Sequence, residues 1–235
     1  MKKVLVITIL LINVVMLYSQ DKKDKDDMFG NKINKRGDML IIDLFDDIWM
    51  NVPDSVDNRI INQGVSVSVT YNFPLGHSPF SLAAGLGIKA HNFYSNSILM
   101  TDSVMSYFSP AARKGKDYKI NKLSITYIQL PIEVRFKSKS KFRAALGFNL
   151  GFKIDGHTKY KGTNYFTDPL SGTSDQIKIK QKSTPNLANW NIAVTARVGY
   201  RWINLFASYS ITKMFSENKG PDIYPISVGL SIIPF

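Results

Sequence analysis

The feature that most constrains this chain is a strict alternation of apolar residues with polar or small residues in four separate segments. Successive side chains of a β-strand point to opposite faces, so each segment would have one wholly apolar face. The alternation lasts for about the 9–11 residues that a tilted strand needs to cross a bilayer. The four segments are 64–73, 80–91, 142–155 and 190–202. The pattern favours a transmembrane β-barrel over a soluble barrel or sandwich, whose polar face would meet open water.

The other strands of an eight-stranded barrel are predicted at 38–50, 122–137, 204–213 and 224–235. The connections then alternate between long and short, as in bacterial barrels with short periplasmic turns and longer extracellular loops. The long connections are 51–61, 95–121, 158–187 and 214–223, and the short ones are 74–78, 137–141 and 203–204. An even number of strands places both termini in the periplasm. The sequence therefore predicts an all-β fold, one eight-stranded antiparallel barrel of the outer-membrane type.

The segment 122–137 changes phase near its middle. Leu123, Ile125 and Tyr127 share one parity, whereas the apolar residues from Ile128 onward lie on the other. A β-bulge near Tyr127-Ile128 would restore one continuous apolar face. Pro131 would then point into the lumen. The segment 38–50 is the least regular of the eight, because its apolar alternation is interrupted at Asp46-Asp47.

The first residues have the character of a signal peptide. Lys2 and Lys3 precede an uncharged run over 4–16, and Ser19 supplies a small residue for cleavage. The run is shorter than the ~20 residues of a spanning helix, which argues against a retained anchor. We expect three parts in a protein exported through the inner membrane of a Gram-negative cell. They are a signal peptide over 1–19, a flexible periplasmic segment over 20–36 and the barrel over 37–235.

The chain carries a net charge of +12 and contains no cysteine. The absence of cysteine excludes thiol catalysis, disulfides and cysteine-ligated zinc. A basic cytosolic protein would suggest nucleic acid as a partner, but export argues against it. Basic residues gather in the expected loops, at Arg113-Lys114-Gly115-Lys116 and over 178–182. They suit either the phosphates of lipopolysaccharide or simple solvation of a charged loop.

Aromatic residues are expected at both membrane interfaces. With the termini in the periplasm, Phe73, Phe80, Phe136, Phe142, Tyr200 and Trp202 gather near the periplasmic interface, and Trp190 and Tyr224 lie near the outer one. Two such girdles are typical of membrane barrels.

The stretch Tyr127-Ile128-Gln129-Leu130-Pro131-Ile132-Glu133-Val134-Arg135-Phe136-Lys137 resembles a strand of the PorT-like outer-membrane β-barrel proteins of the Bacteroidetes. Gln20 after the expected cleavage site, the segment 81–87 and the terminal Phe235 resemble that group too. The resemblance implies an eight-stranded barrel that the barrel assembly machinery inserts into the outer membrane. The founding member is associated with protein secretion across that membrane. Strand motifs report barrel architecture, so this role is not transferred on the motif alone.

The inward face of the barrel is expected to carry charges of both signs. A barrel of eight strands is filled by its own side chains, and charges in such an interior must pair to offset their desolvation. The expected lumen charge network consists of Asp43, Lys89, Glu133, Arg135, Arg143, Lys153, Asp155, Arg197 and Arg201. Its expected role is structural. A path for protons or small ions is the alternative.

Catalytic and metal sites are sought first at the histidines. His77 falls in a short turn, whereas His91 and His157 fall near the outer ends of strands, with Asp155 two residues before His157. A Ser-His-acid hydrolase needs a serine near such a histidine and an acid that orients the ring. The inferred faces of His91 and Asp155 point into the lumen, away from lipid. The spacing of the histidines does not suit zinc, and no cofactor motif is present.

We therefore expect a non-enzymatic outer-membrane barrel with an accessory or structural role in surface assembly or protein secretion. The alternatives are a lipid A-modifying hydrolase and a narrow pore. The expected partners are membrane lipids and lipopolysaccharide, the assembly machinery, and a secretion or surface complex. Loops on a rigid scaffold usually carry recognition. Candidate contact residues in the two longest loops are Tyr107, Phe108, Tyr165 and Phe166.

Overall fold

The computed structural model describes residues 40–234 except 55, 58, 103, 111–117 and 164–175. The expected signal peptide and periplasmic segment lie outside the described residues, as do Arg113, Lys114, Gly115, Lys116, Tyr165, Phe166 and Phe235. In the part of the chain that is described, no helix has the length and apolar character needed to span a membrane.

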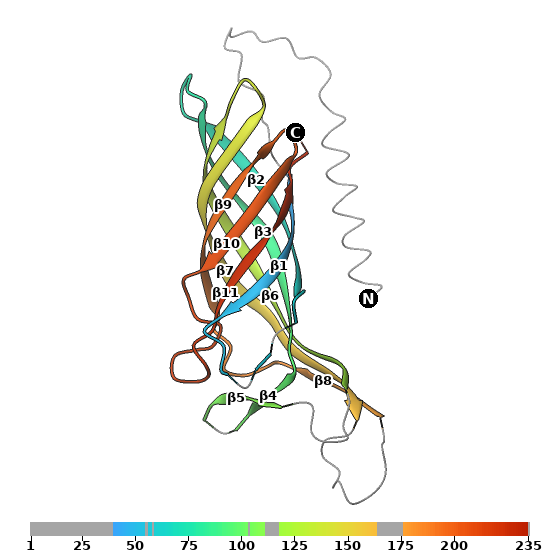
Figure 1. Cartoon of the computed structure of the whole chain (residues 1–235). Coiled ribbons are helices and arrows are strands. Elements are labelled where there is room, and N and C mark those ends of the chain that lie inside the picture. Colours follow the sequence, from blue (N-terminus) through green and yellow to red (C-terminus); the bar gives the residue numbers. More distant parts are fainter. Residues whose placement is uncertain are drawn as a thin grey trace, which may run out of the picture. The chain divides into compact units, whose positions relative to one another are not determined.

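Eight antiparallel strands close into a barrel (Figure 1). They are β1 (Leu40–Met50), β2 (Gln63–Pro74), β3 (Phe80–Tyr94), β6 (Tyr118–Lys137), β7 (Phe142–Thr163), β9 (Trp190–Tyr200), β10 (Ile203–Ser210) and β11 (Tyr224–Ile232). Around the barrel the order is β6-β3-β2-β1-β11-β10-β9-β7, and β7 pairs back onto β6. The first and last strands form a seam that runs from Ile42 opposite Ile232 to Met50 opposite Tyr224. The predicted fold class is confirmed, and each predicted strand overlaps an observed one.

Apolar side chains cover the outside of the barrel and polar ones fill the inside. In β2, Val65, Val67 and Val69 are exposed, whereas Ser66 and Ser68 are buried. Apolar side chains also face outward along the seven other strands of the barrel, whose inward positions are polar in the middle and partly apolar toward the long-loop end. A soluble protein has the reverse distribution, with polar side chains outside, whereas an apolar exterior suits contact with lipid. The alternation in the sequence therefore arises because one face of each strand meets lipid and the other faces the lumen.

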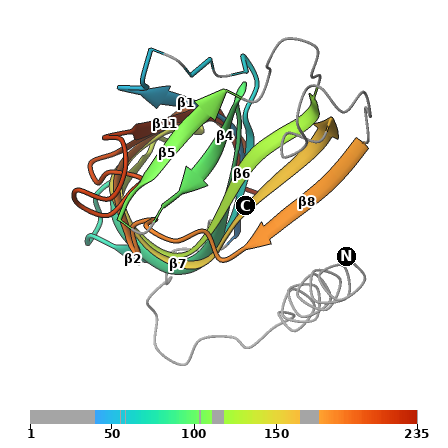
Figure 2. The same cartoon turned by 90° about the horizontal axis from the view of Figure 1, so that it is seen from below.

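Additional strands form at the end of the barrel that carries the long connections. β4 (Ser97–Thr101) and β5 (Ser106–Pro110) make a two-stranded hairpin, which lies across this end of the barrel (Figure 2). β8 (Gln176–Lys182) pairs with the outer part of β7. The sequence-based expectation of plain loops over 95–121 and 158–187 is wrong for these parts. Their alternation is short and carries no lipid-facing pattern, so nothing in the sequence set them apart from loops.

The predicted bulge in 122–137 is also placed on the wrong strand. Within 122–137, β6 alternates without an extra residue, with Leu123, Ile125 and Tyr127 buried inside the barrel. The register instead shifts in β7, where Asp155 pairs with Thr126 and Lys153 with Tyr127, so that Ile154 is the extra residue. The change of phase in the sequence arises because the interior of the barrel becomes apolar near the long-loop end. Pro131 is buried on the lumen side, as expected.

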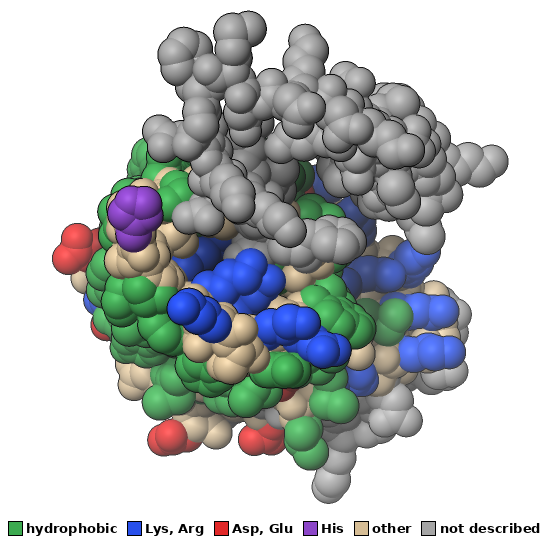
Figure 3. All heavy atoms as spheres, turned by 90° about the horizontal axis from the view of Figure 1, so that it is seen from above, with side chains coloured by type: hydrophobic (Ala, Val, Ile, Leu, Met, Phe, Trp, Pro, Cys, Tyr) green, Lys and Arg blue, Asp and Glu red, His purple; other side chains and the backbone are tan. Residues whose placement is uncertain are grey.

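The short turns lie together at the opposite end. β9 ends at Tyr200, so the turn to β10 is Arg201-Trp202 rather than the predicted 203–204, and Arg201 has a positive φ of 55°. Lys137, Lys139 and Lys141 are exposed in the neighbouring turn. Basic side chains are therefore prominent on this face of the molecule (Figure 3).

Candidate functional site

A buried network of ion pairs crosses the middle of the lumen. Arg197 on β9 donates hydrogen bonds to Glu133 on β6 and to Asp43 on β1, with 2.9 Å between Arg197 Nη2 and Asp43 Oδ2. Arg135 Nε donates to Glu133 Oε2 over 2.9 Å. All four side chains are buried, and a buried charge costs several kcal/mol unless it is paired and hydrogen-bonded. The network thus joins β1, β6 and β9 across the interior.

Neutral polar side chains extend this network along the lumen. Arg135 also donates to Asn72 Oδ1 at 2.6 Å and to Thr70 Oγ1 at 3.2 Å, both on β2. Gln129 Nε2 donates to Ser66 and Ser68 at 2.7 and 2.8 Å. These residues occupy alternate positions on their strands, so the lumen-facing parity supplies a nearly continuous set of donors and acceptors.

A second polar centre lies around His91. His91 Nδ1 lies 2.8 Å from Asp47 Oδ2, and Ser227 Oγ donates to Asp47 Oδ1 over 2.6 Å. Lys89 Nζ lies 4.8 Å from the centre of the Phe45 ring, a cation–π distance. A cavity of about 10 Å³ adjoins His91, enough for about one water molecule. Among the residues that the structure describes, the buried carboxylates are Asp43, Asp47 and Glu133, and the buried cations inside the same lumen are Lys89, Arg135 and Arg197.

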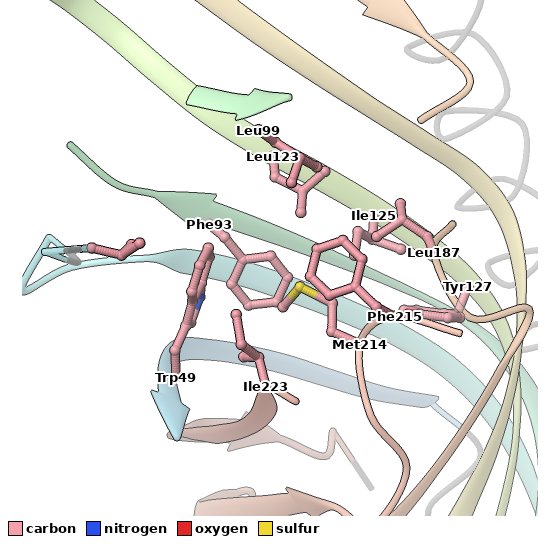
Figure 4. Close-up of a cluster of buried hydrophobic side chains, with 11 residues drawn as sticks. Trp49, Phe93, Leu99, Leu123, Ile125, Tyr127, Leu187, Met214, Phe215 and Ile223 are labelled. Carbon is pink, nitrogen blue, oxygen red and sulfur yellow. The ribbon is translucent and has the colours of Figure 1, made fainter. Parts of the chain in front are cut away.

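Next to this centre, on the side of the long loops, an apolar cluster closes the end of the barrel (Figure 4). Its buried members come from the inward faces of β1, β3 and β6 and from the long connections. They are Trp49, Val56, Phe93, Leu99, Leu123, Ile125, Tyr127, Leu187, Met214, Phe215 and Ile223. The ring of Phe108 on the β4–β5 hairpin packs 5.7 Å from Trp49 and 6.2 Å from Phe215. The lumen is therefore filled by ion pairs in the middle and by apolar side chains at this end.

The structure brings together only part of the predicted lumen charge network. Asp43, Lys89, Glu133, Arg135 and Arg197 lie together and are buried. Arg143 and Lys153 face inward but are half-buried. Lys153 Nζ donates to the Leu187 backbone oxygen over 2.6 Å.

Two residues of that set lie outside the lumen, contrary to the prediction. Asp155 is 51% exposed in its side chain, because the extra residue Ile154 turns it onto the outer wall. Arg201 is exposed in its turn, and its guanidinium lies 5.5 Å from the centre of the Tyr200 ring. Asp47 and Ser227, which are not in the predicted network, are buried in the lumen as well. Continuing the parity of Asp43 along β1 leads to Asp47, so a signal for it was present.

The outer wall carries a polar pair near the long-loop end. His157 Nδ1 lies 2.6 Å from Asp155 Oδ2, and Ser124 on β6 is the cross-strand neighbour of His157. Ser124 Oγ donates to Asn92 Oδ1 at 2.8 Å rather than to the histidine. The earlier inference that Asp155 faces away from lipid is therefore wrong, whereas His91 is buried in the lumen as expected.

The predicted interface aromatics lie on the outer wall toward its two ends. At the short-turn end, Phe80 packs 5.2 Å from Phe136, and Phe142 pairs with Tyr200. Phe73, Trp202 and Tyr200 are exposed at the same end. Toward the long-loop end, Trp190 lies 5.0 Å from Phe152, and Tyr224 pairs with Met50.

The two described loop-contact candidates point in different directions. Tyr107 is exposed on the β4–β5 hairpin, whereas Phe108 packs onto the apolar cluster. His77 lies exposed in the turn after β2. Among the described residues, no group of three or more histidine, aspartate or glutamate side chains is arranged to hold a metal ion.

Comparison with known proteins agrees with this geometry. No curated protein matches the chain. A family model described as "Outer membrane protein beta-barrel domain" matches residues 38–216, which includes seven of the eight barrel strands and most of the chain. The chain therefore belongs to the outer-membrane β-barrel domain family.

Proposed function

We propose that this protein is a non-enzymatic member of the PorT-like group of the Bacteroidetes, with an accessory or structural role in surface assembly or protein secretion. The observation that carries the proposal is the filled lumen. Ion pairs around Glu133 and the apolar cluster around Phe93 occupy successive parts of the described lumen, which supports a role that does not use the interior. Recognition is then left to the long-loop end of a rigid scaffold. The motif over 127–137 supports the group assignment. In β6 its residues alternate between the lumen and the lipid-facing wall.

The β4–β5 hairpin is the proposed contact surface for a protein partner. Its turn exposes Val104 and Met105, β5 exposes Tyr107, and Val104 is 70% exposed. The hairpin is held in place by a backbone hydrogen bond from Ser106 N to the Lys219 oxygen over 2.9 Å. Exposed apolar side chains on an ordered element are typical of an interaction site.

A pull-down in mild detergent tests this surface. We expect the wild type to recover a secretion or surface complex, and the double variant Val104→Ser/Tyr107→Ser to lose it. Leu75→Ser, an exposed apolar residue in a turn at the other end, is the matched control and should retain the partner. Recovery of no partner by the wild type would contradict the proposed role.

We further propose that residues 1–19 are removed as a signal peptide and that 20–36 form a periplasmic segment. The assembly machinery would insert the barrel over 37–235 with both termini and all short turns in the periplasm. An epitope inserted after Val104 should then be labelled on intact cells, and one inserted after Gly76 should not. Labelling in the reverse pattern would invert the orientation.

A lipid A-modifying hydrolase is the second candidate, and one observation favours it. Asp155 and His157 form a hydrogen-bonded pair on the outer wall, with Ser124 beside them. Such a pair can orient a general base, but the serine donates to Asn92 and is not joined to His157. We therefore expect purified protein to release no fatty acid from lipid A. Release that is lost in His157→Ala and kept in His77→Ala would replace the proposed function with this one.

A narrow pore has the weakest support, because two different barriers lie in series along the lumen. The Asp43–Arg197–Glu133 network forms the first, and the apolar cluster forms the second. We expect no discrete conductance from the purified barrel in planar bilayers. Discrete channels in that experiment would instead favour the pore.

A further inference from the structure

Beyond the apolar part of the outer wall, β6, β7 and β8 continue as a three-stranded sheet (Figure 1). The register defines rows of side chains across it. Ile128 and Phe152 form the last paired apolar row, the bulge residue Ile154 lies just beyond it, and Thr126 and Asp155 form the next row. Further along come a row with His157 opposite Lys182, a row of Lys122, Lys159 and Lys180, and a row with Lys161 opposite Lys178.

These lysines share the outward face of the sheet. Directly opposed residues in an antiparallel pair lie on the same face. Leu123 and Ile125 of β6 point into the barrel, so Lys122 between Leu123 and Asn121 points outward. The lysine face, defined as Lys122, Lys159, Lys161, Lys178, Lys180 and Lys182, is thus continuous with the lipid-facing wall.

The only acid placed beside the lysine face among the described residues is Asp155, in the row before Lys182, and it is hydrogen-bonded to His157. The ion pairs found there do not include any of its six lysines. Lys122 Nζ instead donates to Asn92 Oδ1 over 2.8 Å and lies 5.4 Å from the centre of the Tyr94 ring. Arg59 lies over the same ring, also at 5.4 Å, and extends the positive charge along the barrel wall. Like charges directly opposite each other destabilise a sheet, so an anion bound between them would relieve that repulsion.

The position of the lysine face relative to the apolar wall identifies the source of the anion. Lys182 lies in the row of Ser124, four residues beyond Ile128 on β6. Four residues span about 13 Å of strand, and a tilt of about 40° reduces this to about 10 Å in height. The lysines therefore begin at the level of the lipid headgroups. Neighbouring strands lie about 4.8 Å apart, so one phosphate can contact lysines from two strands.

We propose that the lysine face binds the phosphate groups of a phosphorylated glycolipid of the lipid A type in the surrounding outer leaflet. Lysine binds phosphate as a point charge, and clustered lysines beside a membrane recognise anionic headgroups. The proposal rests on the proposed orientation, with the long loops outside the cell, and does not depend on which protein partner, if any, binds the β4–β5 hairpin.

The test is a titration of the full mature barrel, in neutral detergent micelles, with lipid A. Three samples are compared: the wild type, the variant Lys159→Gln/Lys161→Gln/Lys180→Gln, and the control Lys137→Gln/Lys139→Gln/Lys141→Gln. The control removes the same charge from an exposed turn at the other end. We expect lipid A to raise the unfolding temperature of the wild type and the control alike. The lysine-face variant should need at least about tenfold more lipid A for the same rise.

Further titrations separate the sources of phosphate and the role of charge. Phosphatidylcholine, and inorganic phosphate at the same phosphate concentration, should not raise the unfolding temperature. An equal effect of inorganic phosphate would overturn the lipid assignment. An equal loss in the control variant, or none in the lysine-face variant, would overturn the site. Because the readout is lipid binding in micelles, failure of the pull-down and failure of this titration are distinguishable.

Discussion

Glu133 accepts hydrogen bonds from two arginines, Arg135 and Arg197, in a part of the barrel that is closed to solvent. Neither arginine can lose its charge, so both depend on this carboxylate and on Asp43 for compensation. Gly147, opposite Glu133, has no side chain, and a Cβ there would lie 2.2 Å from the Ile132 oxygen. The strands approach closely at this point, and the glycine is what permits it.

Glu133→Gln removes the charge and keeps the shape. We expect it to lower the free energy of unfolding by about 3–5 kcal/mol, because it leaves two buried guanidinium groups under-compensated. Urea unfolding of the barrel in lipid vesicles measures this. Asp222→Asn, which breaks the exposed pair with Lys213 at 2.9 Å, is the control and should change stability little. Equal effects of the two substitutions would show that the network contributes no special stability.

Asp102 gives a prediction about pH. Its carboxylate accepts hydrogen bonds from the backbone N–H groups of Met105 and Val104, both at 2.8 Å, and they hold the pKa of Asp102 below its ordinary value of 3.8. A lowered folded-state pKa means that this stabilisation is complete above the ordinary value. It is lost as the pH falls through the lowered pKa. The amide protons of Val104 and Met105 should therefore exchange faster in acid, relative to the intrinsic rate.

Two variants at position 102 separate ionisation from hydrogen bonding. Asp102→Ala should show fast exchange at every pH, whereas Asp102→Asn, which keeps an acceptor oxygen, should show protection independent of pH. Unchanged protection in Asp102→Ala would mean that the hairpin turn does not need this side chain.

At the scale of the element, the extra residue Ile154 explains how β7 serves two environments. Up to Lys153, the alternation places every second residue in the lumen, and Ile154 and Asp155 then both face outward. A bulge of this kind adds a residue without changing the partner strand.

Deletion of Ile154 should therefore be tolerated, because Lys153 and Asp155 would become neighbours in a regular ladder. Deletion of Leu150, in the regular part of β7, should prevent folding, because every residue on one side of the deletion moves to the other face. The mobility of unheated barrel on a detergent gel, compared with heated protein, measures folding in both cases. Folding of both variants, or of neither, would contradict this view of the bulge.

The sequence predicted the barrel strands well because lipid imposes one simple rule on the outer face. Val65 and Leu146 follow it, and so the eight strands and their alternating connections could be predicted. The interior follows no such rule, since an inward position can hold a charged side chain, as at Asp47, or an apolar one, as at Phe93. Leu123 is apolar and faces the lumen, so the apolar pattern of the sequence changes parity there although β6 has no bulge at that point. β8 and the β4–β5 hairpin lie beyond the lipid and left no comparable signature.

At the scale of the whole molecule, the outer wall itself is the feature to test. Leu146 is 66% exposed in β7, on the lipid-facing parity. Leu146→Arg should lower the free energy of unfolding in bilayers by about 2–4 kcal/mol, because a charge would face hydrocarbon. Val104→Arg, at an equally exposed apolar residue on the β4–β5 hairpin, should change it little. Equal tolerance of both arginines would mean that this wall does not meet lipid.

The pairing of β1 with β11 has a consequence for biogenesis. The ring can close only when β11 reaches β1, because β11 is the strand that pairs with both β10 and β1. A product truncated before Tyr224 would offer β1 and β10 as bare edges, whose amide and carbonyl groups no lipid tail can satisfy. Only chains that contain β11 can therefore settle in the bilayer as sealed cylinders.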